Sequence, residues 1–333
     1  MKVGIYNTTD GGGRRFEAFR EIYEGVLEIV DFDCAPTMEN LDRIGEAGVE
    51  ALIYYNPKHE DDAFFRKMAE QGVRYLSTTS AGFDHYNLEA MKKYGIKGAN
   101  VPQYSPNAVS EHTVLLTLAL LRNFRQQFLR TENRDYRTDG LMARELRSMT
   151  VGIIGCGRIG VTTLRCLSGF GPKKLYASDP AEREDVRQFA EYASPETLYR
   201  ECDVILFHAA ATPENYHMIN DAAIASMKKG MLLVNCARGQ LFDLNAVIRG
   251  LESGQLGGVA MDVIEGEELL LHRHGGPVCP HPELRRLMEF PNFTYTQHTA
   301  YLTDEAYSDI TRTCLQNLLD YARTGVCARE LVP

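Results

Sequence analysis

The sequence predicts two α/β domains, each built on a parallel sheet wound with helices. Short β-rich runs alternate with helical patterns over roughly the first hundred residues, and the alternation restarts at Thr150. The runs after Thr150 are unbroken apolar stretches, which are typical of parallel strands covered on both faces. The length of 333 residues also corresponds to about two domains.

The first part of the chain contains five strand-like runs with helical patterns between them. The expected strands are 3–6, 27–32, 51–55, 73–78 and 96–100, and the clearest helices are 63–71 and 88–94. This order of elements predicts strands joined by helical crossovers, as a parallel sheet requires.

A longer helix is expected to begin at Ser105-Pro106 and to run to about Arg130. Serine is a favourable N-cap, and proline fits the first helical position. The middle of this helix, 114–121, is apolar on every face, so it should be buried all round. Either the domains of the same chain or a partner subunit could cover it.

The second part of the chain contains six further apolar runs and ends in a helical pattern. The expected strands are 151–154, 174–177, 204–207, 232–235, 258–263 and 293–296. The pattern over Asp304–Thr324 cannot form a domain alone, so we expect it to pack on the first domain. The prediction is a discontinuous domain, 1–102 plus 300–333, around a continuous one, 103–299.

Composition excludes several classes of function. The 36 Lys and Arg residues against 45 Asp and Glu give a net charge of −9, which argues against the phosphate backbone of a nucleic acid as the main partner. The apolar stretch 114–121 is too short for a membrane span, and the first ten residues lack a secretory pattern. Eight cysteines without a C-x-x-C pair indicate reduced thiols in the cytoplasm.

A glycine motif predicts a dinucleotide site. Gly155, Gly157 and Gly160 form G-x-G-x-x-G between a strand and a helix expected over 161–168. Gly155 allows the tight turn, Gly157 lets the backbone approach a pyrophosphate, and Gly160 lets the helix lie close to the strand. Asp179 ends the next strand, where an acid binds the adenosine ribose and favours NAD over NADP. The alternatives are a plain turn with a capping aspartate, or NADP binding through Arg183.

Three polar residues follow strands at the edge where open α/β sheets bind ligands. Arg238 can bind a carboxylate through two parallel hydrogen bonds, while a glutamate of the segment 264–267 and His298 can exchange protons. Alone, each residue has a structural explanation, such as a surface ion pair, a solvated loop or a satisfied core histidine. Their common placement favours a catalytic site.

These segments resemble the D-isomer-specific 2-hydroxyacid dehydrogenases, and the resemblance covers the whole chain. The matching segments are 101–108 (VPQYSPNA), 155–160 (GCGRIG), 235–239 (NCARG), 261–267 (MDVIEGE) and 298–300 (HTA). The nearest members are D-lactate dehydrogenases and enzymes that act on 2-hydroxyisocaproate or 2-hydroxyglutarate. The resemblance implies two Rossmann-like, doubly wound domains, of which the first is flavodoxin-like, and a homodimer formed through the helix at about 106–130.

The resemblance also implies roles for individual residues in an NAD-dependent interconversion of a 2-oxo acid and its D-2-hydroxy acid. His298 is the general acid, Glu267 keeps it protonated, and Arg238 binds the substrate carboxylate and polarises the carbonyl. Backbone N–H groups of Ser80, Ala81 and Gly82 also hold that carboxylate. Further cofactor contacts are expected at Arg158, Ile159, Ala209, Asn215, Cys236, Ala237 and Asp262.

Two departures from the family pattern and two rival functions remain. Gln297 and Ala210 stand where the family commonly has proline, and their presence relaxes the backbone beside the cofactor.

One rival function is that of an NAD-sensing protein related to the C-terminal-binding corepressors; the end of this chain soon after Thr324 favours the enzyme. The other is a formate- or glycerate-type dehydrogenase, against which the segments 104–108 and 265–267 argue.

Aromatic residues predict the substrate class. We expect an apolar wall without an adjacent basic residue, so monocarboxylic 2-oxo acids should be preferred over 2-oxoglutarate and oxaloacetate. Arg14 or Arg15 would be the basic residue if this preference is reversed. The wall residues are Tyr55, Phe83, Tyr104 and Tyr301.

No metal site is expected. The only group of metal-capable side chains at close spacing comprises His272, His274, Cys279 and His281. Glycine and proline make this segment an irregular loop, and nothing in it arranges a closed tetrahedron.

Overall fold

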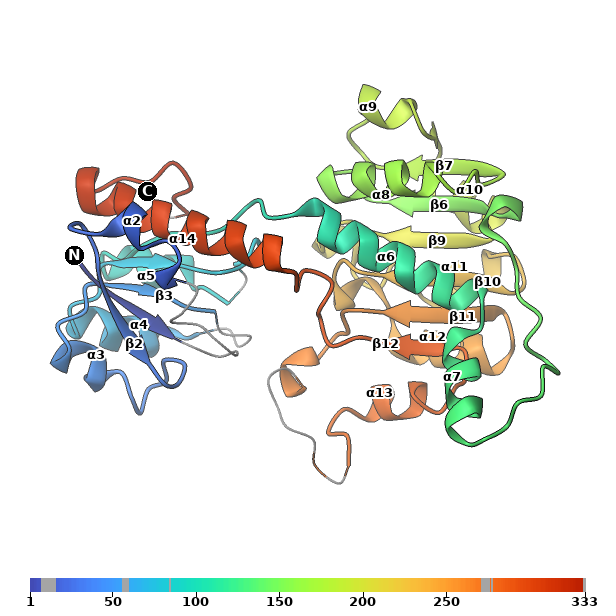
Figure 1. Ribbon diagram of the computed structural model, residues 1–333, viewed down its shortest axis with the longest axis horizontal. Helices are drawn as coiled ribbons and strands as arrows, with labels where there is room; N and C mark the ends of the chain where they lie inside the picture. The colour runs from blue at the N-terminus through green and yellow to red at the C-terminus, as the bar shows by residue number, and fades with distance from the viewer. Residues whose placement is uncertain (7–15, 56–59, 84, 271–275, 277, 332–333) are drawn as a thin grey trace. The chain divides into compact units, whose positions relative to one another are not determined.

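The chain forms two compact units in the computed structural model, and each is an open parallel sheet covered by helices (Figure 1). Unit 1 comprises Met1–Ser105 and Thr303–Pro333, and unit 2 comprises Pro106–Leu302. The structure describes all residues except 7–15, 56–59, 84, 271–275, 277 and 332–333. The crossings expected from the sequence, after residues 102 and 299, lie three residues before those between the two units.

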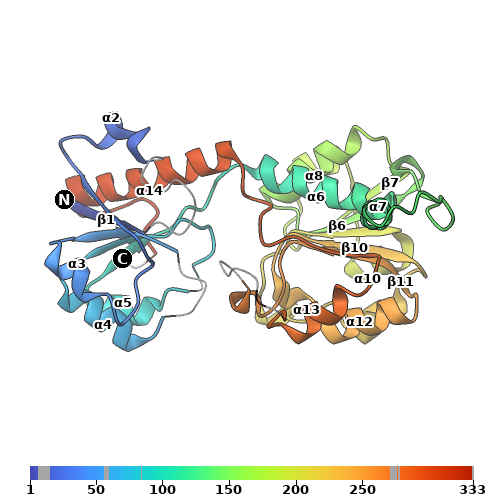
Figure 2. The same ribbon diagram turned by 60° about the horizontal axis from the view of Figure 1, so that its bottom comes forward.

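Unit 1 has a five-stranded parallel sheet in the order β2-β1-β3-β4-β5, the flavodoxin-like order. In Figure 2, α3, α4 and α5 lie over one face of this sheet, and α2 and α14 lie over the other. Its strands are β1 (Lys2–Tyr6), β2 (Glu28–Phe32), β3 (Ala51–Ile53), β4 (Tyr75–Ser77) and β5 (Lys97–Ala99). Its helices are α2 (Arg20–Tyr23), α3 (Asp42–Glu46), α4 (Asp62–Glu70), α5 (Leu88–Lys93) and α14 (Asp304–Thr324).

Helix α14 returns the end of the chain to unit 1. Thr303 caps its start by accepting a hydrogen bond from Ala306 N, and Gly325 ends it with φ 72°. Asn317 is fully buried and donates to Ser77 Oγ at 3.1 Å and to the Asn100 carbonyl at 3.0 Å. These two bonds tie α14 to the ends of β4 and β5.

Unit 2 has a seven-stranded parallel sheet in the order β12-β11-β10-β9-β6-β7-β8. In Figure 2, α6, α7 and α8 cover one face, and α10, α12 and α13 cover the other. The strands are β6 (Thr150–Ile154), β7 (Lys174–Ser178), β8 (Glu191–Tyr192), β9 (Val204–Phe207), β10 (Met231–Asn235), β11 (Leu256–Met261) and β12 (Phe293–Tyr295).

The helices of unit 2 include several short 3₁₀ turns close to the strand ends. The α-helices are α6 (Pro106–Leu121), α7 (Phe124–Glu132), α8 (Arg158–Ser168), α9 (Glu184–Arg187), α10 (Pro195–Glu201), α11 (Asp221–Ser226), α12 (Leu244–Glu252) and α13 (Pro282–Leu287). The 3₁₀ turns are η1 (Leu146–Ser148), η2 (Pro213–Asn215), η3 (Gly239–Leu241) and η4 (Glu267–Leu269).

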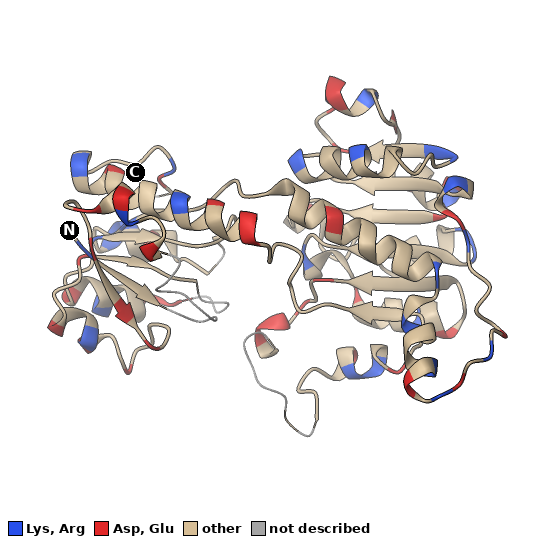
Figure 3. Ribbon diagram, viewed as in Figure 1, with Lys and Arg blue, Asp and Glu red and all other residues tan. Residues whose placement is uncertain are grey.

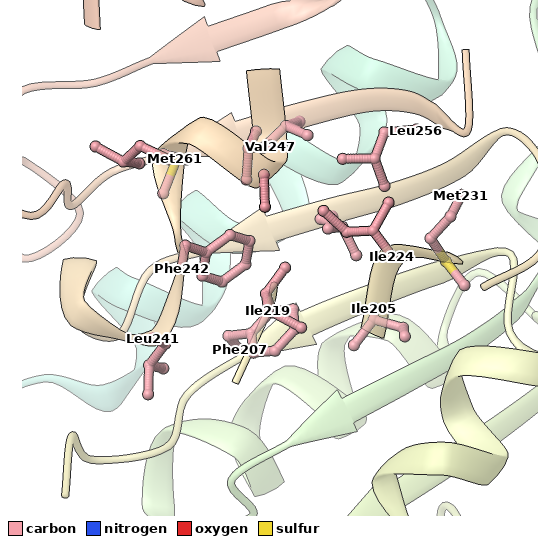
Figure 4. Packing of buried hydrophobic residues seen from close by; sticks show 14 of the residues in the cluster. Ile205, Phe207, Ile219, Ile224, Met231, Leu241, Phe242, Val247, Leu256 and Met261 are labelled. Carbon is pink, nitrogen blue, oxygen red and sulfur yellow. The ribbon is translucent and has the colours of Figure 1, made fainter. Parts of the chain in front are cut away.

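The sheet of unit 2 is buried because its central strands carry apolar residues on both faces. Strands β6, β9, β10 and β11 contain no charged residue, whereas acidic and basic residues alternate over the helices and loops (Figure 3). Figure 4 shows the core under α11 and α12, where the rings of Phe207 and Phe242 meet edge to face at 4.8 Å between centroids. The carboxyl ends of these strands are therefore held rigidly.

The predicted helix from Ser105 to Arg130 is wrong in one respect, because the structure divides it into α6 and α7. Asn123 lies between the two helices with φ 51°, a left-handed conformation that asparagine tolerates. Arg125 then donates to the Phe293 carbonyl at 2.6 Å, which fixes α7 beside the start of β12. Burial all round is also not reached within one chain, since Leu115 on α6 is 58% exposed.

We expect Asn317→Ala to lower the free energy of unfolding by about 2–4 kcal/mol, because it leaves buried partners unpaired and an empty volume beside the sheet. Urea unfolding of the full chain measures this change. The matched control is Gln316→Ala, whose side chain donates to Asp320 one turn along the same helix. An equal effect of both substitutions would contradict the role of Asn317 in holding α14.

Candidate active site

The glycine loop lies where the strand order of unit 2 reverses, between β6 and β9. Gly155 has φ 92°, and a Cβ there would lie 2.3 Å from the backbone nitrogen of Ala209. A Cβ on Gly160 would lie 2.2 Å from the Gly155 carbonyl oxygen, so α8 approaches the strand closely only with glycine. A Cβ on Gly157 would meet nothing within 4 Å. The open space at Gly157, next to the first turn of α8, fits a pyrophosphate.

Asp179 lies against this loop. Its Oδ2 accepts a hydrogen bond from Cys156 N at 2.7 Å, and its Oδ1 accepts one from Ala181 N at 2.8 Å. The carboxylate is therefore fixed beside the loop, and its role toward a ribose stays a prediction. Arg183, the alternative group for a 2′-phosphate, is paired through two N–H groups with Asp185.

Arg238 is presented by a turn directly after β10. Asn235 holds this turn, since its Oδ1 accepts from Ala237 N at 3.0 Å and its Nδ2 donates to the Arg238 carbonyl at 2.9 Å. The guanidinium of Arg238 donates from Nη1 to the Ala237 carbonyl at 2.8 Å. The half-buried guanidinium is thereby oriented at the strand edge.

Glu267 and His298 meet although 31 residues separate them in the sequence. His298 Nδ1 donates to Glu267 Oε1 at 2.8 Å, and Glu267 Oε2 accepts from Ile264 N at 3.3 Å. Their side chains are 31% and 20% exposed. With Nδ1 committed to the carboxylate, Nε2 is the ring atom that can pass a proton to a bound molecule.

The backbone at His298 is strained and is held by Asp262. His298 has φ 53°, in the left-handed region that side chains other than glycine rarely adopt. Its N–H donates to the Asp262 carbonyl at 2.7 Å, and the Asp262 carboxylate accepts from Thr299 N at 2.9 Å and Ala300 N at 3.0 Å. Asp262, only 1% exposed, thus holds the turn that carries the histidine.

The charges around His298 favour its protonated form. Burial opposes the imidazolium, but the hydrogen bond that His298 donates to Glu267 and the charges of Glu267 and Asp262 outweigh burial and the repulsion of Arg238, so the pKa of His298 is raised above its ordinary value. Burial alone would also raise the pKa of the Asp262 carboxyl, yet the hydrogen bonds that it accepts leave that pKa lowered. The same carboxylates thus favour the charged form of His298, while Asp262 itself is held in its ionised form by the groups that donate to it.

The structure distributes the other predicted cofactor residues along the same edge. Arg158 and Ile159 begin α8, Ala209 follows β9, and Cys236 and Ala237 follow β10. Asn215 belongs to the η2 turn, where its side chain accepts from Thr212 N and donates to the Ala210 carbonyl. Its role toward a cofactor stays a prediction, as do those of the others.

Of the predicted substrate residues, the structure brings only Tyr301 beside the histidine within one unit. The rings of Tyr301 and His298 lie edge to face, 6.0 Å apart. Tyr55, Phe83, Tyr104 and the segment Ser80, Ala81 and Gly82 all belong to unit 1. There, Ser80 Oγ donates to the Gly82 carbonyl at 2.6 Å and Asn100 Nδ2 donates to the Ala81 carbonyl at 2.8 Å, which shapes the segment after β4. Arg14 and Arg15 lie outside the described residues.

The remaining reactive side chains have structural surroundings. Burial raises the pKa of the Cys156 and Cys236 thiols to about 12, so neither is a thiolate at neutral pH. His281 donates from Nε2 to the Glu265 carbonyl at 2.7 Å. Of the other metal-capable residues, His272 and His274 lie outside the described residues. In the part of the chain that is described, no group of three His, Cys, Asp or Glu side chains forms a metal site.

Comparisons with known proteins identify this arrangement. The model of the D-isomer specific 2-hydroxyacid dehydrogenase NAD binding domain matches residues 114–300. The aromatic 2-oxoacid reductase of Clostridium sporogenes is 38% identical over 333 residues, which cover 100% of this chain and 99% of that protein. The D-lactate dehydrogenase of Escherichia coli K12 is 34% identical over 100% of both chains. The chain belongs to the D-isomer specific 2-hydroxyacid dehydrogenase family.

Structural similarity agrees with this assignment. A D-lactate dehydrogenase from Treponema pallidum has a TM-score of 0.90 to this chain at 31% identity, with 100% of both chains covered. The predicted family, the predicted fold class and NAD as the cofactor are therefore confirmed. This D-2-hydroxyacid dehydrogenase is an NAD-dependent oxidoreductase.

Sequence reasoning missed one residue that shapes the dehydrogenase site and one role of a residue that it did name. Asp262 was expected as a cofactor contact, but it also holds the turn of His298. His112, on α6, was not expected, and its Nε2 lies 3.0 Å from Thr296 Oγ1 and 3.4 Å from Asp262 Oδ1. A histidine inside an apolar helix was the one signal in the sequence that could have indicated a buried polar partner.

In the glycine loop of the dehydrogenase, replacing glycine by alanine should have different effects at positions 157 and 160. Gly157→Ala should leave the free energy of unfolding unchanged and weaken NADH binding by about tenfold, or about 1.4 kcal/mol, because a methyl group there fills only the space next to the cofactor. Gly160→Ala should lower the free energy of unfolding by about 1–3 kcal/mol, because its methyl group meets backbone. Fluorescence titration with NADH and urea unfolding measure both. Equal destabilisation by the two substitutions would contradict this geometry.

Proposed function

We propose that this dehydrogenase reduces a monocarboxylic 2-oxo acid to the D-2-hydroxy acid, with Arg238, Glu267 and His298 as catalytic residues. The observation that carries the proposal is the 2.8 Å bond between His298 Nδ1 and Glu267 Oε1 at the strand edge that also presents Arg238. This group supplies a proton donor, a carboxylate that keeps the donor charged, and a cation for the substrate.

His298 acts as the general acid in reduction. NADH, when bound at the Gly155–Gly160 loop, would supply a hydride to the carbonyl carbon of the substrate. As negative charge develops on the carbonyl oxygen, Nε2 of His298 gives it a proton, and Glu267 stabilises the imidazolium until that transfer. In the reverse direction the neutral imidazole of His298 takes the hydroxyl proton, and Glu267 favours this transfer by stabilising the imidazolium that forms.

Arg238 binds the carboxylate of the 2-oxo acid and polarises the carbonyl. Its planar guanidinium can form two parallel hydrogen bonds to a carboxylate, which fixes the orientation of the substrate. Backbone N–H groups of Ser80, Ala81 and Gly82 are proposed to bind the same carboxylate. The family resemblance supports this role.

The substrate side chain is proposed to be apolar, from the methyl group of pyruvate to a branched or aromatic group. The edge-to-face contact of Tyr301 with His298 supports an aromatic wall on that side of the site. Tyr55, Phe83 and Tyr104 are proposed to complete the wall. Two relatives, named aromatic 2-oxoacid reductase and D-lactate dehydrogenase, act on substrates of this class by their names.

The dehydrogenase is further proposed to be a cytoplasmic homodimer. All eight cysteines are free, which suits a reducing compartment. Within the described residues, no helix has the length and apolarity that a membrane span requires. On α6 and α7, Leu115, Phe124 and Phe128 are each more than half exposed, and a partner subunit would cover them.

Glu267→Gln should move the pH dependence of reduction to lower pH. Reduction needs protonated His298, so its rate is retained below the pKa of His298 and lost as pH rises through it. Glu267 raises that pKa, and an amide does not, so the loss should begin at a lower pH in the variant. Rates of NADH oxidation across the pH range measure the shift. An unmoved profile would remove Glu267 from the mechanism.

The substrate class is tested by NADH oxidation with pyruvate, 2-oxobutyrate, 4-methyl-2-oxopentanoate, phenylpyruvate, 2-oxoglutarate and oxaloacetate. We expect kcat/KM to be highest for a monocarboxylate, because a second carboxylate would stay unpaired against the aromatic wall. His298→Ala should lower kcat by roughly 10²–10⁴ with the preferred substrate. A higher kcat/KM for 2-oxoglutarate than for every monocarboxylate would refute the proposed class.

Sedimentation equilibrium tests the homodimer. We expect Phe128→Glu to convert the dimer to a monomer, because an unpaired charge cannot be buried in an apolar interface at low cost. Phe170→Glu is the matched control, since Phe170 is also exposed but follows α8. A wild-type chain that sediments as a monomer would contradict the proposal.

A further inference from the structure

A second histidine–carboxylate pair lies two residues before Glu267. His217 donates from Nε2 to Glu265 Oε2 at 2.7 Å, and the Tyr216 hydroxyl donates to Glu265 Oε1 at 3.0 Å. The rings of Tyr216 and His217 are stacked, with their centroids 3.9 Å apart. Both carboxylate oxygens of Glu265 are therefore held by the segment that follows β9.

The main chain of Glu265 is also fixed. Its carbonyl accepts from Nε2 of His281, a histidine that is 4% exposed. Gly239, directly after Arg238, lies against the peptide between Ile264 and Glu265, and a Cβ on Gly239 would be 2.1 Å from Glu265 N. The segments that carry Arg238 and Glu267 thus meet at Glu265.

The segment that carries His217 is bonded to the residues after Arg238. His217 N donates to the Gln240 carbonyl at 2.9 Å, and Ile219 N donates to the Leu241 carbonyl at 3.0 Å. His217 has φ 50°, a left-handed conformation that costs free energy in any residue with a side chain. Such strain persists where surrounding contacts fix the residue, and it is frequent at functional sites.

We propose that Glu265 and His217 are positioning residues that hold the 264–267 turn, so that the carboxylate of Glu267 reaches Nδ1 of His298. Glu267 Oε2 accepts from Ile264 N, so its orientation depends on this turn. The inference rests on the proposed function and deepens it. Glu265 and His217 act through Glu267, whereas the turn of His298 is held separately by Asp262.

Loss of this pair should change the acid–base behaviour of His298. The charged groups that face His298 are Glu267, Asp262 and Arg238, and of these only Glu267 lies on the 264–267 turn. A misplaced Glu267 raises the pKa of His298 less, because both its hydrogen bond and its charge act over a longer distance.

The variants Glu265→Gln and His217→Asn test the proposal. Asparagine tolerates the left-handed backbone of His217, but it is too short to reach Glu265. We expect each variant to lower kcat for reduction by between about tenfold and 10²-fold, with little change in KM for NADH. The pH at which reduction is lost should move downward, as expected for Glu267→Gln. The double variant should be no worse than the single ones, because the two residues act as a unit.

The matched control is Asp221→Asn, which removes an exposed carboxylate that is paired with Arg249 a few residues after His217. This control should leave kcat and the pH profile unchanged. In the background of Glu267→Gln, adding Glu265→Gln should not move the pH profile further. A general loss of stability would lower the unfolding temperature without moving the profile.

The imidazole titration of His298, followed by NMR of the histidine-labelled chain and assigned with His298→Ala, gives a readout that is independent of turnover. We expect a lower pKa of His298 in Glu265→Gln and in His217→Asn than in the wild type. An unchanged titration in both variants would overturn the positioning role. By contrast, a wild-type chain that reduces none of the 2-oxo acids would refute the proposed function while this titration still decides the inference.

Discussion

Every group of the candidate site depends on one constraint, which is that parallel strands end at the same edge of their sheet. Strands β9, β10, β11 and β12 are neighbours in the sheet of unit 2, so the order of the strands alone brings together the residues that follow them. Arg238, Glu267 and His298 each follow a different strand of this set. The uncharged strands β9 and β10 are fully buried and make the edge rigid, and the loops supply the chemistry.

Convergence of strands does not orient side chains, and short-range polar contacts complete the site. Asn235 holds the turn of Arg238, and Asp262 holds the turn of His298. Each uses a side chain at the end of a strand to bond backbone N–H groups that the sheet leaves unpaired. The carboxylates of Asp262 and Glu267 also raise the pKa of His298, an effect that Arg238 offsets in part. The same contacts therefore fix geometry and charge.

Much of this organisation could be predicted from the sequence, for identifiable reasons. β-rich and unbroken apolar runs predict the strands, and the spacing of Gly155, Gly157 and Gly160 predicts the nucleotide loop. The end of α6 could not be predicted, because the left-handed backbone of Asn123 interrupts a pattern whose periodicity continues. The two-residue strand β8 was missed because Glu191 and Tyr192 give no apolar run. The local sequence pattern predicts a helix or strand well where burial of apolar residues determines its limits. It predicts the limits less well where a single backbone angle determines them.

The pairing of His217 with Glu265 belongs to a third category, since each residue type is visible in the sequence but their contact is not. The two residues are 48 positions apart, and only the neighbouring β9, β10 and β11 bring their loops together. Residue type and strand position do not distinguish Glu265 from Glu267, because both are acids on one short segment, and only the family resemblance selects Glu267. Their difference arises from the turn at Gly266, whose φ of 81° directs the carboxylates to different histidines. Gly266 thus separates two carboxylates with different tasks. Glu267 meets the proton donor His298, and Glu265 fixes the turn that carries Glu267.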